Sequence, residues 1–383
     1  MAQGSIRKHV REGSVRYEVV VDLGKDPVTN KRRQRTKTFK TKKEAQAYLA
    51  AWRVEIDRGV AVDRSQQTVA QMMEYWLQTH VRPRLRAKTV YDYEQTITKH
   101  ILPALGPIAV QKLGPDVLQQ FYSDKLAAGC GVRTIRLCHL HLSQALKQAV
   151  RLGLVVRNVA DLVTQPQERS REMQTWSAEE AQAFLAVADQ SCHGPLWLLA
   201  LTTGLRRGEL LGLRWKDVDL ERGVLHVHQT VIALRGHAAF SLPKTPRSRR
   251  SADLLDPVTL ALREHKRRQN AQRLALGAAW QDHDLVFCTG LGTPIDPDNL
   301  KRDYQRLVAL AGVPRIRIHD VRHTFTTHAL ASGANVKAVS EAIGHADISI
   351  TLRTYAHVLP EQRREVAAKV SAAFFPAPVA DVS

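Results

Sequence analysis

The sequence predicts a mostly α-helical protein with small β-sheets, an α+β fold class, on the strength of three observations. Residues 5–39 contain three short segments in which apolar and polar positions alternate, as in strands. Residues 68–151 repeat apolar positions at helical spacing in four segments. From residue 177 onward, helical patterns dominate and short strand-like stretches interrupt them. We therefore expect a small three-stranded sheet with one helix, a helical bundle, and a mixed, mainly helical C-terminal part.

The N-terminal segment, residues 1–62, is expected to form a domain of its own. Its three strands are predicted at residues 5–10, 14–21 and 31–39. Thr41 and Glu44 form a capping-box pattern that begins a helix. The third strand alternates basic residues, which we expect on the sheet face left open by that helix: Lys31, Arg33, Arg35 and Lys37. Residues 1–60 hold 15 Lys or Arg against 7 Asp or Glu, so this face is a candidate DNA contact. The alternative is a solvated basic face.

A helical domain is predicted over residues 66–165, after a linker at 61–67. Pro103 and Gly106-Pro107 are expected to break its second helix, and Pro115 to open its third. Four helices of this length form a compact bundle. Exposed basic residues could contact DNA from it, although exposed Lys and Arg are common on any surface. The candidates are Arg82, Arg84, Arg86, Lys88, Lys99, Arg133 and Arg136.

The third domain is predicted over residues 172–383, after a polar linker at 164–175. Ser177 and Glu180 give a second capping box, and residues 194–203 are apolar enough for a buried helix. Residues 223–231 are strand-like, and the segments through Phe240 and 251–255 can complete the same small sheet. Further helices are predicted around 256–268 and 297–311. A tail helix is expected to dock on a neighbouring subunit or on its own domain through Val366, Val370 and Phe374.

Composition narrows the classes of partner. The 383 residues carry a formal net charge of +19, which favours nucleic acid as the counterpart. A membrane partner is not expected, because no run of about 18 apolar residues and no signal peptide is apparent. The four cysteines are far apart without a CxxC pair, so we expect reduced core residues in a cytoplasmic protein. They are Cys130, Cys138, Cys192 and Cys288.

Residues 319–358 contain a group of polar side chains that could meet at one phosphate. His319 and Arg322 are three residues apart and share a helix face. Ser332-Gly333 ends that helix, and Gly344 ends the next one and leaves His345 in a turn. A third helix, capped by Asp347 or Ser349, carries Tyr355. His319 and His323 have the spacing of metal ligands, but a third ligand is lacking, so no metal site is predicted.

These residues lie in sequence boxes that resemble those of the tyrosine recombinases, the phage integrase family. His319-Asp320-Val321-Arg322-His323 matches the family's His-x-x-Arg-His box, and Ile343-Gly344-His345 matches its Leu-Gly-His-like turn. Residues 354–357 match the box of the nucleophilic tyrosine, and residues 203–210 the Thr-Gly-Leu-Arg-x-x-Glu-Leu box of its first arginine. Pro243-Lys244-Thr245 matches the family's β-hairpin lysine. The departures are small, with Val321 and Ile343 where leucine is common.

The resemblance and the chemistry of the residues together suggest a role for each. Two guanidiniums match the oxygens of a phosphodiester, so Arg206 and Arg322 are the candidates for neutralising its charge. The resemblance implies that Tyr355 is the nucleophile and Lys244 the acid for the 5′ leaving oxygen. His319 could move the tyrosine proton and His345 donate a hydrogen bond to phosphate. Glu209 is expected to orient nearby groups, and His323 to be a supporting or a core residue.

The function implied is that of a site-specific recombinase, an integrase that cuts and rejoins DNA through a covalent 3′-phosphotyrosine. It would integrate or excise a phage genome or other mobile element in the bacterial cytoplasm. Expected partners are core-type and arm-type sites on double-stranded DNA, a homotetramer in the synapse, a host DNA-bending protein and an excision factor. No cofactor or metal is expected. The alternatives are a catalytically inert DNA-binding protein and a type IB topoisomerase-like enzyme.

Overall fold

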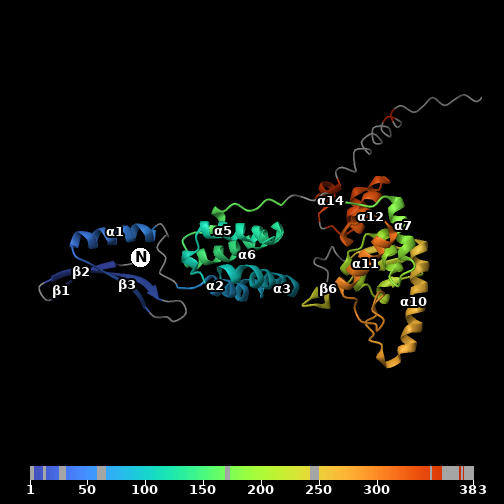
Figure 1. Ribbon diagram of the computed structural model, residues 1–383, viewed down its shortest axis with the longest axis horizontal. Coiled ribbons are helices and arrows are strands. Elements are labelled where there is room, and N and C mark those ends of the chain that lie inside the picture. The colour runs from blue at the N-terminus through green and yellow to red at the C-terminus, as the bar shows by residue number, and fades with distance from the viewer. Residues whose placement is uncertain are drawn as a thin grey trace, which may run out of the picture. The chain divides into compact units, whose positions relative to one another are not determined.

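The computed structural model describes residues 4–11, 14–25, 32–57, 66–168, 173–241, 250–345 and 347–355, together with residues 371 and 374. It is mostly helical with small antiparallel sheets, which confirms the predicted fold class (Figure 1). The chain divides into two compact units, Met1–Arg169 and Ser170–Ser383. The finer division into three domains stays a prediction.

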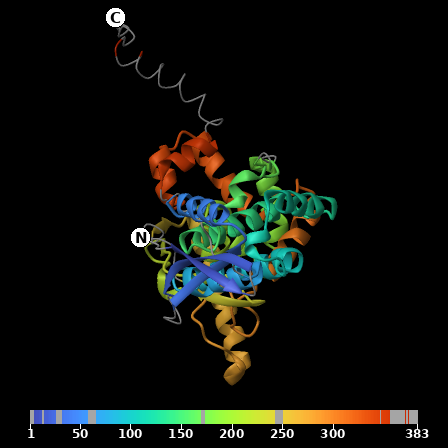
Figure 2. The same ribbon diagram turned by 90° about the vertical axis from the view of Figure 1, so that its left-hand side faces the viewer.

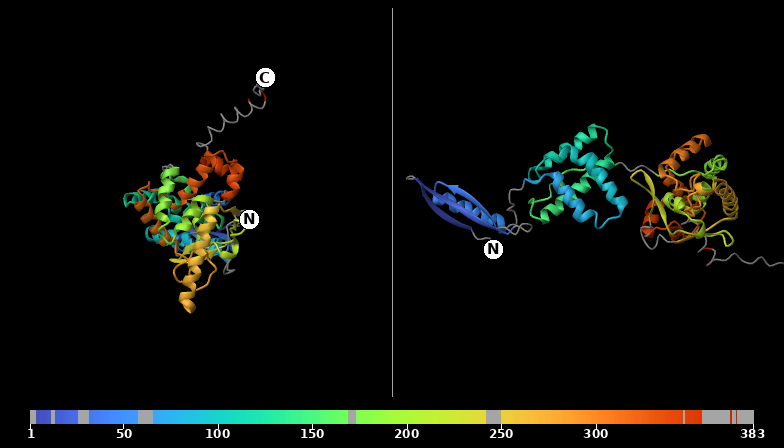
Figure 3. Two further views of the ribbon diagram at one scale, coloured as in Figure 1. Left: turned by 90° about the vertical axis from the view of Figure 1, so that its right-hand side faces the viewer. Right: turned by 90° about the horizontal axis from the view of Figure 1, so that it is seen from below.

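The first unit begins with an antiparallel sheet of order β1-β2-β3. Its strands are β1 (Gly4–Arg11), β2 (Ser14–Lys25) and β3 (Arg32–Phe39). Helix α1 (Lys42–Asp57) lies along one face of the sheet (Figure 3). The predicted capping box is present, since Thr41 Oγ1 accepts from the Glu44 backbone N–H at 3.2 Å. Val19, Val21, Ala45 and Leu49 form the small core between sheet and helix.

The strand register corrects the prediction about the basic face. Residues directly opposite in a ladder point to the same side of a sheet. Lys37 is paired with Val19, whose side chain lies in the core beneath α1, so Lys37 lies on the helix-covered face. Lys37 Nζ lies 4.7 Å from the ring centre of Tyr48, which lies on α1. Lys31 lies outside the described residues. The sequence showed that basic residues alternate along the strand, but it did not show which side of the sheet the helix covers.

The open face of the sheet therefore carries the other set of side chains. Arg7 pairs with Glu18, His9 with Arg16, and Thr36 and Thr38 lie opposite Val20 and Glu18. The exposed members of this set are Arg7, His9, Arg16, Thr36 and Thr38.

A helical bundle follows from Thr68. Its main helices are α2 (Val69–Trp76), α3 (Ala87–Thr96), α5 (Pro115–Ala127) and α6 (Val132–Arg151). Thr68 and Gln71 form a capping box at the start of α2. Most apolar positions of the four helical stripes are buried in one core, whereas Tyr93 is only partly buried and Leu126 is exposed. The bundle is thus assembled around the helical periodicity that the sequence displays.

Pro103 does not break its helix as predicted. A π-helical turn, Ile97–Ile101, follows α3, and Pro103 lies near the start of the short helix α4 (Leu102–Leu105). Proline lacks an N–H, which the first turn of a helix does not need. The helical path therefore continues to Gly106.

The second unit is built on the buried helix α8 (Gly194–Thr203), which lies where the sequence predicted it. Helices α7 (Ala178–Ala188), α10 (Asp256–Leu276), α11 (Pro297–Ala311) and α12 (Ile318–Ala331) accompany it. The core contains an aromatic group in mutual contact: Trp176, Phe184, Trp197 and Tyr304. Helix α11 packs on α7, and α12 packs on α8.

The single sheet predicted in this unit is two sheets. Strands β4 (Val218–Asp219), β5 (Val224–His226) and β8 (Ser251–Asp253) form one, in the order β4-β5-β8. Strands β6 (Thr230–Leu234) and β7 (His237–Ser241) form a separate hairpin. The two sheets are separated by residues 227–229, which lie between β5 and β6, although the Val227 N–H still donates to the Arg250 carbonyl beside β8 at 2.9 Å. Helix α10 extends away from the C-terminal helices (Figure 2).

The four cysteines do not share one environment. Cys138 is buried, but Cys192 is exposed, so the prediction that all four are core residues was wrong. Among the described helices, none is long and apolar enough to cross a membrane. Of the tail residues Val366, Val370 and Phe374, only Phe374 is described, and it is exposed.

Candidate active site

Arg206 is placed by the turn between α8 and the short helix α9 (Arg207–Gly212). Gly204 ends α8 in the left-handed conformation at φ +61°, where a Cβ would lie 2.5 Å from Phe325 Cδ1. The chain then turns so that Arg206 is the N-cap of α9. The Arg206 backbone N–H donates to Glu209 at 2.8 Å, and its Nη1 donates to the same carboxylate at 2.9 Å. The guanidinium is thus fixed by Glu209 while 36% of the side chain stays exposed.

Arg322 lies on α12 and is almost fully buried, with 3% of its surface exposed. Its Nη1 donates to the Gly204 carbonyl at 2.9 Å, and its Nη2 donates to the Ile343 carbonyl. Burial, followed by the positive charge of Arg206, lowers the pKa of Arg322 to about 9. The guanidinium thus remains charged at neutral pH and is held between two backbone segments.

His345 follows the turn that ends helix α13 (Val336–Ala342). Gly344 has φ +66°, and its carbonyl accepts from Arg206 Nη2 at 2.8 Å. His345 Nδ1 lies 2.8 Å from Thr351 Oγ1. Burial, then Arg322 and Arg206, lower the pKa of His345 to about 4, so the ring is neutral near pH 7. The turn therefore brings His345 together with both predicted arginines.

Tyr355 is the last residue of helix α14 (Ile348–Tyr355), which follows α12 and α13 in the C-terminal part of this unit (Figure 1). The Asp347 side chain accepts from the Ser349 N–H at 2.8 Å, so Asp347 is the cap residue. The Tyr355 ring is buried with Leu330 and Val339. Its hydroxyl lies 2.5 Å from His323 Nδ1. Burial raises the pKa of Tyr355, so the phenol is neutral in this arrangement.

His323, rather than His319, contacts the tyrosine hydroxyl. Burial, then His319 and Arg322, lower the pKa of His323 to about 4, which leaves a neutral ring able to accept the phenolic proton in a hydrogen bond. His319 is exposed, and its ring stands edge-on to His323 with centres 4.9 Å apart. Loss of hydration and the Arg322 charge lower the pKa of His319.

The predicted site residues thus form two linked groups. Arg206, Arg322 and His345 meet at the 343–345 turn, whereas Tyr355 is joined to His323 and His319. Helix α12 connects the groups because it carries Arg322 and both histidines. Lys244 lies outside the described residues, with the rest of the Pro-Lys-Thr segment.

Sequence reasoning missed one arginine altogether. Arg250 donates through both terminal nitrogens to Glu209, at 3.1 and 2.8 Å, and through Nε to the Ala342 carbonyl at 2.6 Å. Its side chain is 7% exposed. Arg250 closes a run of basic residues at 247–250 that reads as an exposed loop, so no local signal distinguishes it. Glu209, expected to orient nearby groups, contacts both Arg206 and Arg250.

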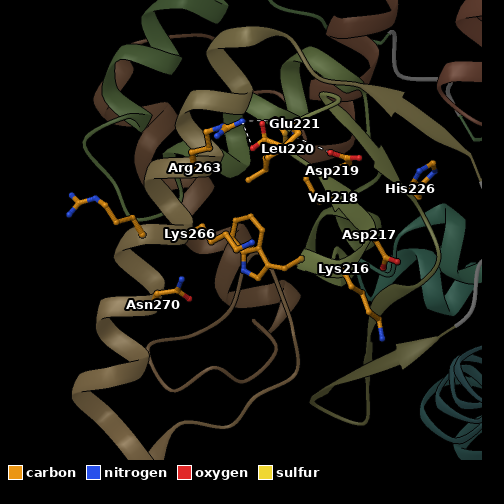
Figure 4. A pocket seen from close by; sticks show the side chains of 12 residues that line it. Lys216, Asp217, Val218, Asp219, Leu220, Glu221, His226, Arg263, Lys266 and Asn270 are labelled. Carbon is orange, nitrogen blue, oxygen red and sulfur yellow. Dashed lines mark hydrogen bonds and ion pairs between the residues drawn. The ribbon is translucent and has the colours of Figure 1, made fainter.

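A cavity lies elsewhere in this unit, and none of these site residues line it. It measures about 830 Å³ and lies between the 215–221 segment and α10, with Trp215, Glu221 and Arg263 among its lining residues (Figure 4). Within the described ranges, no three His, Cys, Asp or Glu side chains gather as metal ligands would. The cations of the site are its own arginines.

Three family models match consecutive parts of the chain. The phage integrase family matches residues 174–362, the N-terminal SAM-like domain of phage integrases residues 68–126, and the arm DNA-binding domain residues 5–56. A tyrosine recombinase XerC-like protein of Caldanaerobacter subterraneus is 32% identical over 375 residues, covering 93% of this chain and 95% of that protein. The chain belongs to the phage integrase family of tyrosine recombinases. Enzymes of this family cleave and rejoin DNA.

Other tyrosine recombinases and integrases are similar to this chain over most of its length. The ICEBs1 integrase of Bacillus subtilis is 26% identical, covering 92% of this chain and 96% of that protein. The solved Tn1549 transposon integrase, in complex with transposon right-end DNA, has a TM-score of 0.68 at 21% identity. That comparison covers 80% of this chain and 100% of the solved chain, and it confirms the fold.

Proposed function

We propose that this recombinase integrates and excises a mobile DNA element by forming a covalent 3′-phosphotyrosine on Tyr355. The observation that carries the proposal is the 343–345 turn. Neighbouring carbonyls, Ile343 and Gly344, each accept from a different arginine, Arg322 and Arg206. Two guanidiniums fixed side by side can hold the nonbridging oxygens of one phosphate as charge develops on them.

The proposed reaction balances without a cofactor. The Tyr355 oxygen attacks phosphorus, the bond from phosphorus to the 5′ oxygen breaks, and the DNA 3′ end stays on the tyrosine. Lys244 gives its proton to the 5′ oxygen, and His319 takes the tyrosine proton once DNA is bound. His345 donates a hydrogen bond to a phosphate oxygen. Reversal of these steps on a second 5′ hydroxyl reseals the strand, because the phosphotyrosine conserves the bond energy.

In the unbound protein the Tyr355 hydroxyl keeps its proton and is bonded to His323, so it is not ready to attack DNA. A buried neutral phenol bonded to a neutral imidazole keeps its proton, since the pKa of Tyr355 is raised and that of His323 is lowered. DNA binding must therefore move Tyr355 from His323 toward the phosphate. This supports an enzyme that cleaves only within an assembled complex.

The N-terminal sheet is proposed to bind separate arm-type sites while the bundle and catalytic domain bind the core site. The corrected register supports the open face for this role, with Arg7, Arg16, Thr36 and Thr38 on it. A three-stranded sheet of this size can lie in a major groove. We further propose a homotetrameric synapse in the bacterial cytoplasm, assisted by a host bending protein and an excision factor.

Trapping on DNA tests the proposal. The protein is incubated with fragmented DNA from its source cell, denatured, and the covalently attached DNA is sequenced. We expect one core sequence attached through Tyr355, with Tyr355→Phe binding the same DNA and attaching to none. A covalent band from the phenylalanine variant would remove Tyr355 from the nucleophile role.

The role of Lys244 is tested with a bridging 5′ sulfur, which leaves without a proton. Lys244→Ala should cleave ordinary core-site DNA about 10²–10⁴-fold more slowly and recover most of this loss on the sulfur-substituted strand. Arg322→Ala should not recover, because its role is charge stabilisation. Equal defects of Lys244→Ala on both strands would leave it an electrostatic role only.

Deleting residues 1–62 tests the arm. Core-site cleavage should persist while recombination that depends on flanking sites is lost. The slope of log affinity against log salt should fall by about 0.9 for each phosphate contact removed. Arg7→Ala should reproduce part of that change and Lys37→Ala should not, because Lys37 lies on the helix-covered face. An unchanged slope after deletion would show that the segment is not a DNA-binding arm.

A further inference from the structure

Three consecutive backbone carbonyls each accept from a different arginine. The Ala342 carbonyl accepts from Arg250 Nε at 2.6 Å, the Ile343 carbonyl from Arg322 Nη2, and the Gly344 carbonyl from Arg206 Nη2 at 2.8 Å. These residues are where α13 ends. The last carbonyls of a helix lack partners within it and carry its negative partial charge. The turn is therefore a natural acceptor for several cations at once.

Arg250 differs from the other two arginines in what its donors do. All three of its side-chain nitrogens have protein acceptors, namely Glu209 for the terminal pair and Ala342 for Nε. The Arg250 side chain is 7% exposed, against 36% for Arg206, so it presents less surface to a phosphate than Arg206 does. Arg322 is as deeply buried, at 3%, and what sets Arg250 apart from it is the ion pair with Glu209. Arg250 is therefore suited to hold other groups rather than to bind DNA.

Two connections run from Arg250 to the proposed catalytic residues. Through Glu209, which is 2% exposed and also accepts from the backbone N–H and Nη1 of Arg206, it holds both the backbone and the guanidinium of that arginine. Through Ala342 it fixes the turn that precedes His345. Gly344 makes this fit possible, because a Cβ there would lie 2.8 Å from Arg250 Nη1.

Glu209 depends on Arg250 for its charge. Burial by itself raises the pKa of this carboxyl, but the hydrogen bonds and charge of Arg250, with the charge of Arg206, outweigh burial and hold the pKa below its usual value. Without Arg250 the carboxyl would gain a proton at a higher pH than in the native protein. The protonated group would hold Arg206 less firmly.

We propose that Arg250 is a positioning residue for DNA cleavage, which orients Arg206 through Glu209 and holds the 342–344 turn that presents His345. The inference rests on the proposed function, since it assigns Arg250 to the same phosphate site. A group of this kind affects the chemical step more than DNA affinity. Misplacement of a reacting geometry by about 1 Å can cost on the order of 10²-fold in rate.

The first test compares cleavage by Arg250→Ala and Arg250→Lys on the core-site duplex recovered by trapping. Arg250→Ala should lower the rate of covalent complex formation by about 10²-fold with little change in DNA affinity. Lysine keeps the charge but lacks the planar fork, so Arg250→Lys should give an intermediate rate. The acid side of the pH–rate profile of Arg250→Ala should move to higher pH, because Glu209 then protonates more readily.

Arg214→Ala is the matched control. Arg214 donates through Nε and Nη2 to Asp217, another buried carboxylate of the same unit, at 2.6 and 3.1 Å. Its loss should destabilise the unit in a similar way without moving the 342–344 turn. A cleavage defect in Arg214→Ala as large as in Arg250→Ala would show that the effect is general destabilisation, and would overturn the proposal.

A double substitution tests the route through Glu209. If Arg250 acts on Arg206 by way of this carboxylate, Arg250→Ala should cost much less cleavage rate in a Glu209→Gln background than in the native protein. It should also leave the acid limb of the Glu209→Gln profile in place, since that carboxyl no longer titrates. Fully additive losses would contradict the connection through Glu209.

The second test needs no DNA and so separates this inference from the proposed function. The titration of His345 is followed by NMR of histidine side chains, with His345→Gln identifying its signal. Its pKa is lowered to about 4 by burial and by Arg322 and Arg206, with His323 and His319 adding smaller effects. In Arg250→Ala or Arg250→Lys the pKa should rise toward the ordinary value, and in Arg214→Ala it should not.

The outcomes of the two tests are distinguishable. A native protein that never attaches to DNA would refute the proposed function, while the titration of His345 would still decide whether Arg250 holds the turn. An unchanged His345 pKa in both Arg250 variants, with native cleavage rates, would overturn the positioning role. If Arg250→Ala does not fold, Arg250→Lys carries both measurements.

Discussion

The helical bundle and the catalytic unit bury polar groups in opposite ways. The buried polar side chains described in the bundle are two histidines, His139 and His141, each beside a tyrosine ring. The catalytic unit, Ser170–Ser383, buries charged groups that are all hydrogen-bonded: Glu209, Asp217 and Asp320 to arginines, and Arg322 to backbone carbonyls. A buried charge is costly unless its partners are in place. The catalytic unit accepts this cost in exchange for guanidiniums that are oriented before DNA arrives.

The largest expected effect comes from removing one charge of the catalytic unit. Glu209→Ala leaves Arg250 buried without its carboxylate, and such a loss typically costs about 3–5 kcal/mol. Hydrogen exchange read by mass spectrometry should show the loss of protection in α8, α9 and α13, and none in α2 or α6. Equal loss of protection in the bundle would mean that the two units do not unfold separately.

The next largest effect is a loss of bundle stability at acidic pH, which the buried ring of His141 controls. Burial lowers the pKa of His141 to about 4, against 6.5 in an unfolded chain. The unfolded chain binds the proton first, so this stability is complete above pH 6.5 and is lost as pH falls toward 4. The loss is on the order of 3 kcal/mol by linkage.

His141→Phe should remove this sensitivity. The substitution keeps a ring against Tyr93 and Trp76 and eliminates a buried Nδ1 that has no hydrogen-bond partner. At pH 5 the amides of α6 should exchange more slowly in the variant than in the native protein, while those of α12 stay unchanged. A bundle that remains as acid-sensitive as before would assign the titration to another group.

A matched pair of caps should affect the two units equally. Thr68 begins α2 and Ser177 begins α7, and each forms a complete capping box. Thr68→Ala and Ser177→Ala should each cost about 1 kcal/mol, because the loss is local to the first turn. Urea unfolding followed by hydrogen exchange in each unit measures both. A difference of several-fold would show that the units differ in helix-end energetics as well as in charge.

The smallest effect is expected at an exposed ion pair of the bundle. Lys88 Nζ lies 2.5 Å from Asp92 Oδ1, with both side chains more than a third exposed. Lys88→Ala should change the free energy of unfolding by no more than about 0.5 kcal/mol, and added salt should reduce even that. A loss above about 1 kcal/mol would mean that bundle charges matter more than the comparison allows.

The sequence predicted the elements of both units better than their faces. Helix α8 was readable from its apolar run and the core stripe of α6 from its helical periodicity, because both signals are local. The prediction for Pro103 was wrong because a π-helical turn precedes it, which places Pro103 in the first turn of α4, where no N–H is needed. The basic face of β3 was misplaced because the side that a helix covers depends on a register between strands, which one strand does not encode.

The site divides along the same line. Sequence boxes of fixed spacing singled out four candidate site residues: Arg206, Arg322, His345 and Tyr355. Arg250 was not, since its burial arises from Glu209 and Ala342, which are 41 and 92 residues away in sequence. The bond between His323 and Tyr355 was equally hidden, because the choice between two neighbouring histidines depends on where α14 docks.

The three carbonyls of the 342–344 turn have a consequence for which mutations this enzyme can tolerate. Backbone acceptors do not change when a side chain is replaced, so substitutions at the half-buried Ala342 should leave Arg250 with its carbonyl partner, whereas Ile343 is fully buried and less tolerant. An insertion or deletion of a single residue there would shift every acceptor by one position. Arg206, Arg250 and Arg322 would then be misassigned together. Mutational scanning should therefore find the turn tolerant of exchanges at Ala342, intolerant of any residue with a Cβ at Gly344, and intolerant of any change in its length.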